Sequence, residues 1–94
     1  MKILIIEDSV RLADTIAEAL QNENYVVDTA NDGQLGYEHA STGIYDMVIL
    51  DLMLPKMNGY EVLSALRRDG DNVPVLILSA KTEIDDKIQG FTTG

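Results

Sequence analysis

The hydrophobic positions of this chain form strand-like runs that alternate with helical patterns. Continuous apolar runs occupy residues 2–6, 46–51 and 73–78, and a β-branched, partly alternating run occupies 25–30. Apolar runs of this length, bounded by turn residues, predict strands that are buried on both faces of a sheet. The alternation at 25–30 instead predicts a strand nearer the edge of the sheet.

Helices are predicted between these strands because each segment begins with a capping residue. Ser9 and Asp32 can cap the first two helices, and Asn58 with Glu61 fits a capping box for the third. The apolar side of the first helix is predicted to be Leu12, Ala13, Ile16, Ala17 and Leu20. That of the second, which contains two glycines, is Leu35, Tyr37 and Ala40, and that of the third is Val62, Leu63 and Leu66.

The order of these elements predicts the fold class. A short fourth helix is expected at residues 83–89, ended by Gly90, with no strand after it. Strand and helix then alternate four times, with connections so short that parallel strands require right-handed crossovers. The sequence therefore predicts one α/β domain over residues 1–94, with a doubly wound parallel sheet between two layers of helices.

Composition narrows the classes of partner. The chain has 94 residues, 16 acids against 7 lysines and arginines, a net charge of −9 and no cysteine. The negative charge repels nucleic acid and anionic membranes. The absence of cysteine excludes disulfides and thiolate metal sites. No segment reaches the ~20 apolar residues of a membrane span. We therefore expect a cytoplasmic protein that contacts neither nucleic acid nor membrane through this segment.

Candidate chemistry gathers where three strands end. Asp51 follows the strand at 46–51, Glu7 and Asp8 follow the first strand, and Ser79 follows the strand at 73–78. Ligands of open α/β sheets bind at the carboxyl ends of strands, so these side chains are expected at one rim. Taken singly, each acid also fits a solvated carboxylate near a helix N-terminus.

Three carboxylates brought together need a cation between them. Oxygen ligands without histidine or cysteine favour a hard ion, and Mg²⁺ is the usual one. Asp51, held by its strand, is the best candidate nucleophile toward a phosphoryl group, and Glu7 and Asp8 are the better metal ligands. Ser79 could donate its hydroxyl to a phosphoryl oxygen.

These motifs together resemble the receiver domain of two-component response regulators. The matching stretches are Glu7-Asp8, residues 50–59 and Leu78-Ser79-Ala80. The residues of the loop after Asp51 and of the segment 73–94 are most similar to the OmpR/PhoB winged-helix subfamily. The resemblance implies a flavodoxin-like fold with strand order 2-1-3-4. It also implies that the protein is not an enzyme but a phosphoacceptor, which assists its own phosphorylation and dephosphorylation. Its implied partners are a sensor histidine kinase and a C-terminal effector domain that binds DNA.

The resemblance also assigns roles to single residues. Glu7 and Asp8 would hold Mg²⁺ with Asp51 and the backbone carbonyl of Met53. Asp51 would accept the phosphoryl group from a phosphohistidine of the kinase. Ser79 would follow that group as the switch residue, and the small Ala80 would leave room for it.

One departure from the family concerns the end of the chain. Receivers have a fifth strand and helix, with a lysine that pairs with the phosphoryl group, and these are expected to be absent here. The strand at 75–78 would then be an exposed hydrophobic edge. We therefore expect a longer chain, or self-association through that edge or the face of the last helix.

Other functions remain open from the sequence. A phosphatase of the haloacid-dehalogenase type also uses a strand-end aspartate with Mg²⁺, but it needs a second aspartate where Met53 stands. A flavin- or nucleotide-binding module would need a glycine-rich phosphate loop where Glu7 and Asp8 stand. Loss of the lysine could also leave a scaffold that is not phosphorylated.

Overall fold

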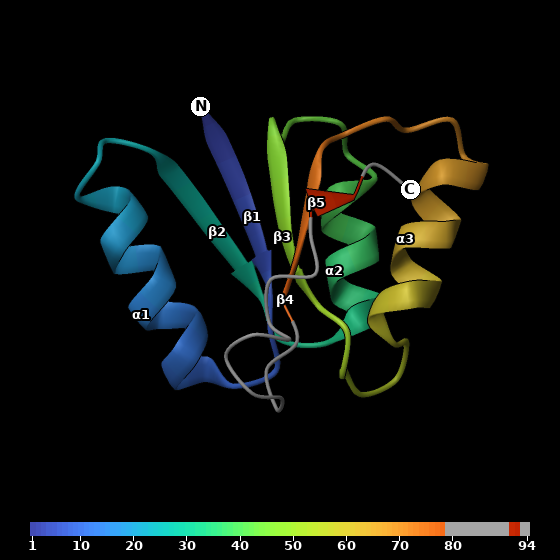
Figure 1. Ribbon diagram of the computed structural model, residues 1–94, viewed down its shortest axis with the longest axis horizontal. Coiled ribbons are helices and arrows are strands. Elements are labelled where there is room, and N and C mark those ends of the chain that lie inside the picture. The colour runs from blue at the N-terminus through green and yellow to red at the C-terminus, as the bar shows by residue number, and fades with distance from the viewer. Residues whose placement is uncertain (79–90, 93–94) are drawn as a thin grey trace.

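A parallel sheet forms the centre of the molecule (Figure 1). The computed structural model describes residues 1–78 and 91–92. Its strands are β1 (Lys2–Ile6), β2 (Val26–Ala30), β3 (Met47–Asp51), β4 (Val75–Leu78) and β5 (Phe91–Thr92). They lie in the order β2-β1-β3-β4-β5, and the first four are parallel. This confirms the predicted strand order 2-1-3-4 and the flavodoxin-like α/β fold.

Three described helices cover the two faces of this sheet. They are α1 (Val10–Gln21), α2 (Gly33–Ala40) and α3 (Gly59–Arg68). Each begins at the predicted cap, since Ser9 and Asp32 accept backbone N–H groups and Asn58 forms a capping box with Glu61. In Figure 1, α1 lies on one face of the sheet, and α2 and α3 lie on the other. None of these described helices has the length and hydropathy that a membrane-spanning helix needs.

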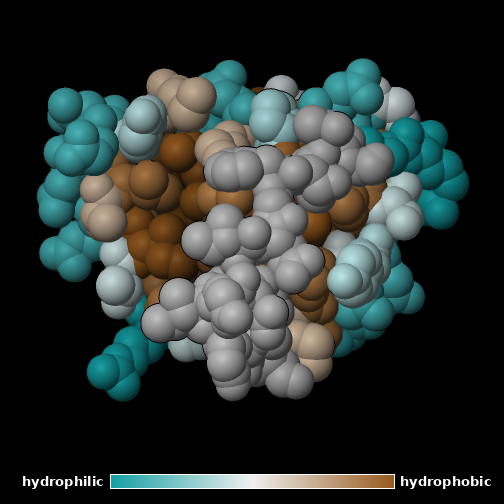
Figure 2. Space-filling view, in the orientation of Figure 1, coloured by the Kyte–Doolittle hydropathy of each residue, from teal (hydrophilic) through white to brown (hydrophobic). Residues whose placement is uncertain are grey.

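The core is split by the sheet because successive strand residues point to opposite faces. Ile3 and Ile5 of β1 pack toward α1, whereas Leu4 and Ile6 pack toward α2 and α3. All four are at most 2% exposed. Burial on both faces explains the continuous apolar runs of the central strands. Figure 2 shows hydrophobic residues gathered between the polar outer surfaces of α1 and α3.

Two predicted contacts of the helices are wrong. Leu12 of α1 and Leu35 of α2 were assigned to apolar faces, yet they are 37% and 39% exposed. In α2, a glycine next to Leu35 makes the close contact with the sheet. A Cβ on Gly36 would lie 2.6 Å from Ile6, so α2 packs on the sheet through its bare backbone. Gly36 thus permits close packing of α2 on β1.

The expectation that no strand follows residue 90 is also wrong. β5 pairs antiparallel with β4, with Val75 opposite Thr92 and Leu76 opposite Phe91. Unpaired backbone groups at a sheet edge are a ready partner for any returning strand. β5 therefore covers Val75 and Leu76 of the β4 edge, and self-association through this edge stays a prediction. The predicted helix at 83–89 and its Gly90 cap lie outside the described residues.

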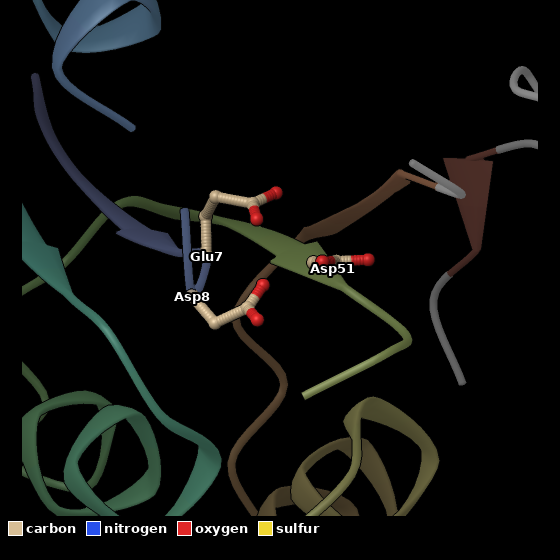
Figure 3. Close-up of side chains that lie close together, drawn as sticks. All are labelled: Glu7, Asp8 and Asp51. Atoms are coloured by element: carbon tan, nitrogen blue, oxygen red, sulfur yellow. The ribbon is translucent and has the colours of Figure 1, made fainter. Parts of the chain in front are cut away.

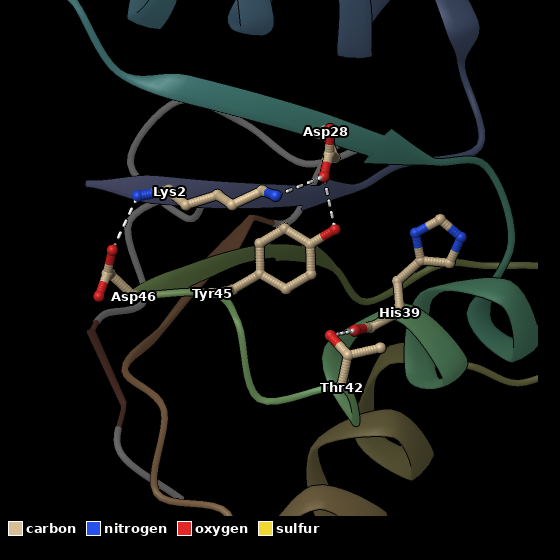
Figure 4. A network of polar contacts seen from close by, with 6 residues as sticks. All are labelled: Lys2, Asp28, His39, Thr42, Tyr45 and Asp46. Carbon is tan, nitrogen blue, oxygen red and sulfur yellow. Dashed lines mark hydrogen bonds and ion pairs between the residues drawn. The ribbon is translucent and has the colours of Figure 1, made fainter.

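A network of polar contacts lies at the end of the sheet where β1 and β3 begin, away from Asp51 (Figure 4). Tyr45 Oη donates a hydrogen bond of 2.6 Å to Asp28 Oδ2, and Lys2 Nζ lies 3.8 Å from the same oxygen. The backbone N–H of Lys2 donates to Asp46 Oδ2 at 2.8 Å. These contacts tie the starts of β1 and β3 to the edge strand β2.

This network predicts a loss of stability at alkaline pH. Burial, and then the hydrogen bond to Asp28, raise the pKa of Tyr45 from 10.0 to about 12. The stability that this tyrosine contributes is therefore complete below pH 10 and is lost as the pH rises to about 12. Urea unfolding should show this loss in the parent and in Tyr60→Phe, whose ring is exposed. A Tyr45→Phe variant with an undiminished loss would contradict the assignment.

Candidate functional site

The candidate site lies at the carboxyl ends of β1 and β3. Ile6 pairs with Leu50 in the register of these strands, so Glu7, which follows β1, lies beside Asp51, the last residue of β3. Glu7, Asp8 and Asp51 each offer an oxygen within 4.8 Å of the others. Figure 3 shows the three side chains extending into the same space. The predicted convergence of these three acids is confirmed.

Burial separates the three carboxyl groups into two kinds. Glu7 and Asp51 are each 1% exposed, whereas Asp8 is exposed. Asp8 also borders an open groove of about 530 Å³ lined by Leu52, Met53, Leu54, Pro55, Asn58 and Tyr60. Two acids thus form the floor of the site, and the third lies at its opening.

Each buried carboxylate accepts a hydrogen bond from a backbone amide on one of its two oxygens. Ser9 N–H donates to Glu7 Oε2 at 3.0 Å, and Met53 N–H donates to Asp51 Oδ1 at 3.1 Å. Glu7 Oε1 is fully buried and has no hydrogen-bond partner in the part of the chain that the structure describes. Leaving a buried charged oxygen without a partner is costly, so this atom points to a ligand of positive charge.

The raised pKa values of Glu7 and Asp51 also point to a positively charged ligand. Burial, with the neighbouring carboxyl groups of Asp8 and Asp51, raises the pKa of Glu7 to about 7, against the opposing Ser9 amide. Burial likewise raises the pKa of Asp51, and the Met53 amide opposes the shift. Two full charges about 5 Å apart repel by about 3 kcal/mol at an effective dielectric of ~20. The site disfavours its own ionised form until a cation enters.

The carboxylate oxygens of Glu7, Asp8 and Asp51 fit a hard divalent cation. Carboxylate oxygens are the ligands that Mg²⁺ prefers, and the exposed Asp8 leaves room for the waters that this ion retains. The alternatives with different chemistry gain no support here. Met53 supplies no second carboxylate for a phosphatase, and two acids stand where a phosphate loop would begin.

The remaining predicted site residues are Ser79, Ala80 and the carbonyl of Met53. Ser79 and Ala80 lie outside the described residues. The Met53 amide bonds to Asp51, and the role predicted for its carbonyl stays a prediction.

Close packing of α3 fixes the strand end that carries Asp51. A Cβ on Gly59 would lie 2.5 Å from the carbonyl oxygen of Asp51, and Gly59 N–H donates to the carbonyl of Leu52 at 3.0 Å. Gly59, which the sequence offered only as part of the stretch 50–59, is the first residue of α3. Sequence reasoning missed Asn31 altogether, whose Nδ2 donates to the carbonyl of Glu7 at 3.0 Å. No periodicity or motif distinguishes that asparagine from a surface residue.

Comparison with known proteins identifies the architecture. Residues 3–94 match the family described as the response regulator receiver domain. The probable transcriptional regulatory protein SilR of Salmonella typhimurium is 42% identical over 94 residues, which are all of this chain and 41% of SilR. The chain thus spans less than half the length of that relative.

Solved structures agree with this match. The receiver domain of the Francisella response regulator 1452 has a TM-score of 0.82 at 31% identity, covering 94% of this chain and 73% of that one. The response regulator TrrA of Thermotoga maritima, solved in complex with Mg²⁺ and BeF, has a TM-score of 0.80 at 32% identity. That match covers 86% of this chain and 70% of TrrA.

Proposed function

Because this chain belongs to the response regulator receiver domain family, we propose that Asp51 is the residue on which it accepts a phosphoryl group. It is a receiver domain of two-component signal transduction, similar to those of OmpR/PhoB-type transcriptional regulators, and its role is regulatory. The observation that carries the proposal is the convergence of Asp51 with Glu7 and Asp8 within 4.8 Å, at the end of a buried strand.

Glu7, Asp8 and Asp51 are proposed to hold Mg²⁺, with the backbone carbonyl of Met53. The orphaned Glu7 Oε1 and the raised pKa of the buried acids support this assignment. When bound, the ion would neutralise charge on the acids and on the incoming phosphoryl oxygens. The TrrA structure, which contains Mg²⁺ and BeF on a similar fold, also supports it.

The chain's own residues define the proposed chemistry. A carboxylate oxygen of Asp51 forms a bond to phosphorus while the bond from phosphorus to the donor breaks, and the electron pair leaves with the donor. Met53 N–H holds one Asp51 oxygen, and β3 keeps the side chain from swinging away. Ser79 would donate its hydroxyl to the transferred group, and Ala80 would leave space for it.

Partners of the whole protein follow from the same family. We propose a sensor histidine kinase as the phosphodonor, and an effector domain, C-terminal in the full protein, as the recipient of the signal. SilR is described as a transcriptional regulator, which supports a DNA-binding effector. The net charge of −9 argues that this segment does not itself grip DNA.

Intact-mass spectrometry tests the proposed function directly. Incubation with Mg²⁺ and acetyl phosphate is expected to add one phosphoryl group to the chain, and a chelator in place of Mg²⁺ should prevent it. Beryllofluoride should bind under the same Mg²⁺ requirement. An unchanged mass and no beryllofluoride binding, in a folded sample, would show that the acids are an inert cluster.

A further inference from the structure

The turn between β2 and α2 contacts the Glu7-Asp8 loop and the loop that follows Asp51. This turn, residues 31–33, passes the end of β1, which lies between β2 and β3 in the sheet. It thereby contacts the Glu7-Asp8 loop on one side and the loop 52–58 after Asp51 on the other. The proposed function assigns it no role.

On the first side, the turn fixes the peptide group of Glu7. Asn31 Nδ2 donates to the Glu7 carbonyl at 3.0 Å, and Glu7 N–H donates to the carbonyl of Ala30 at 3.0 Å. Asp32, not Asn31, caps α2, so helix capping does not explain the asparagine. Both polar groups of the Glu7 backbone are therefore held by the β2 end.

On the second side, the turn contacts a loop of unusual backbone. Met57 N–H donates to the Pro55 carbonyl at 2.7 Å, two residues back, and Lys56 between them has a φ of +70°. That γ-turn is rare and strained for a side-chain-bearing residue, and such strain persists only when neighbouring structure enforces it.

Gly33 supplies the enforcing contact. Its N–H donates to the same Pro55 carbonyl at 3.3 Å, and a Cβ added to it would lie 1.5 Å from the Met57 carbonyl oxygen. The loop therefore rests against bare backbone, and any side chain at position 33 must push residues 55–57 away.

We propose that Asn31 and Gly33 are positioning residues, which set the separation between the Glu7-Asp8 loop and the loop 52–58 after Asp51 and so tune the affinity of the acid cluster for a divalent cation. The inference rests on the proposed function, because the cation is the one proposed there. The two residues contact no ligand themselves and act through Glu7 and through the loop that follows Asp51.

Isothermal titration with Mg²⁺ tests this role, alongside urea unfolding in chelator. In Asn31→Ala and Gly33→Ala the Mg²⁺ dissociation constant should rise by about 10-fold, the scale seen when the supports of metal ligands are removed. Asn22→Ala, at an exposed asparagine that ends α1, is the control for Asn31. Gly43→Ala is the control for Gly33, because its φ of +78° strains alanine in open space far from the acids.

The outcomes separate this inference from the proposed function. A parent that fails to bind Mg²⁺ would refute the function itself, and with it the inference. A parent that binds, with a folded Asn31→Ala that binds equally well, would overturn only the positioning role. If Gly33→Ala does not fold, Asn31→Ala against Asn22→Ala decides. Equal weakening by Gly43→Ala would assign the effect to stability and also overturn it.

Discussion

Asparagine in place of Asp51 is expected to abolish phosphoryl incorporation, the largest single effect that the structure predicts. An amide oxygen carries no charge and cannot form the acyl phosphate that a carboxylate forms. The fold should survive, because the asparagine Oδ1 can still accept the Met53 N–H that now binds Asp51 Oδ1. Intact-mass spectrometry after incubation with acetyl phosphate and Mg²⁺ measures the loss.

A matched control isolates the role of this one carboxylate. Asp14→Asn removes an equal charge from the exposed surface of α1, so it should incorporate the phosphoryl group as the parent does. Incorporation that persists in Asp51→Asn, mapped by peptide sequencing to another acid, would reassign the acceptor. Asp8 is then the first residue to test, because it is the exposed member of the cluster.

The convergence of these acids could be predicted from the sequence because strand ends are geometrically tied. Ile3 to Ile6 and Val48 to Leu50 are apolar without interruption, which marks parallel strands buried on both faces. Their carboxyl ends must then share a rim. The helix caps at Ser9, Asp32 and Asn58 could also be predicted, because each side chain accepts an N–H only three residues further along the chain.

What could not be predicted depends on contacts between distant segments. Gly36 carries no hydrophobic signal in the sequence, yet its missing side chain lets α2 approach Ile6. Leu35, which the sequence assigned to the apolar face, is exposed instead. The antiparallel pairing of β5 with β4 carries no local signal, because two residues are too few for a periodic pattern. Asn31 and Gly33 likewise matter only once the turn is seen between the two loops.

Glutamine in place of Glu7 is expected to stabilise the metal-free protein above pH 7 by on the order of 1–3 kcal/mol, while removing its response to Mg²⁺. A neutral amide ends the burial of a charge and can still accept the Ser9 N–H. The parent should gain stability from Mg²⁺ by mass action, since only its folded state assembles the three acids. Urea unfolding with chelator or Mg²⁺ measures both effects, and Glu18→Gln, an exposed change on α1, is the control.

The pH dependence of this difference identifies its cause. Because the pKa of Glu7 rises on folding from 4.5 to about 7, its protonation favours the folded state. That contribution is complete below pH 4.5 and is lost as the pH rises to about 7, so the advantage of Glu7→Gln in chelator should be small in acid and grow across this interval. Asp51, whose pKa is also raised, leaves a residual slope in the variant. An advantage independent of pH would instead point to packing, because steric effects do not titrate. The predicted combination of a more stable apo-protein and a lost Mg²⁺ response is what distinguishes a ligand from a structural acid.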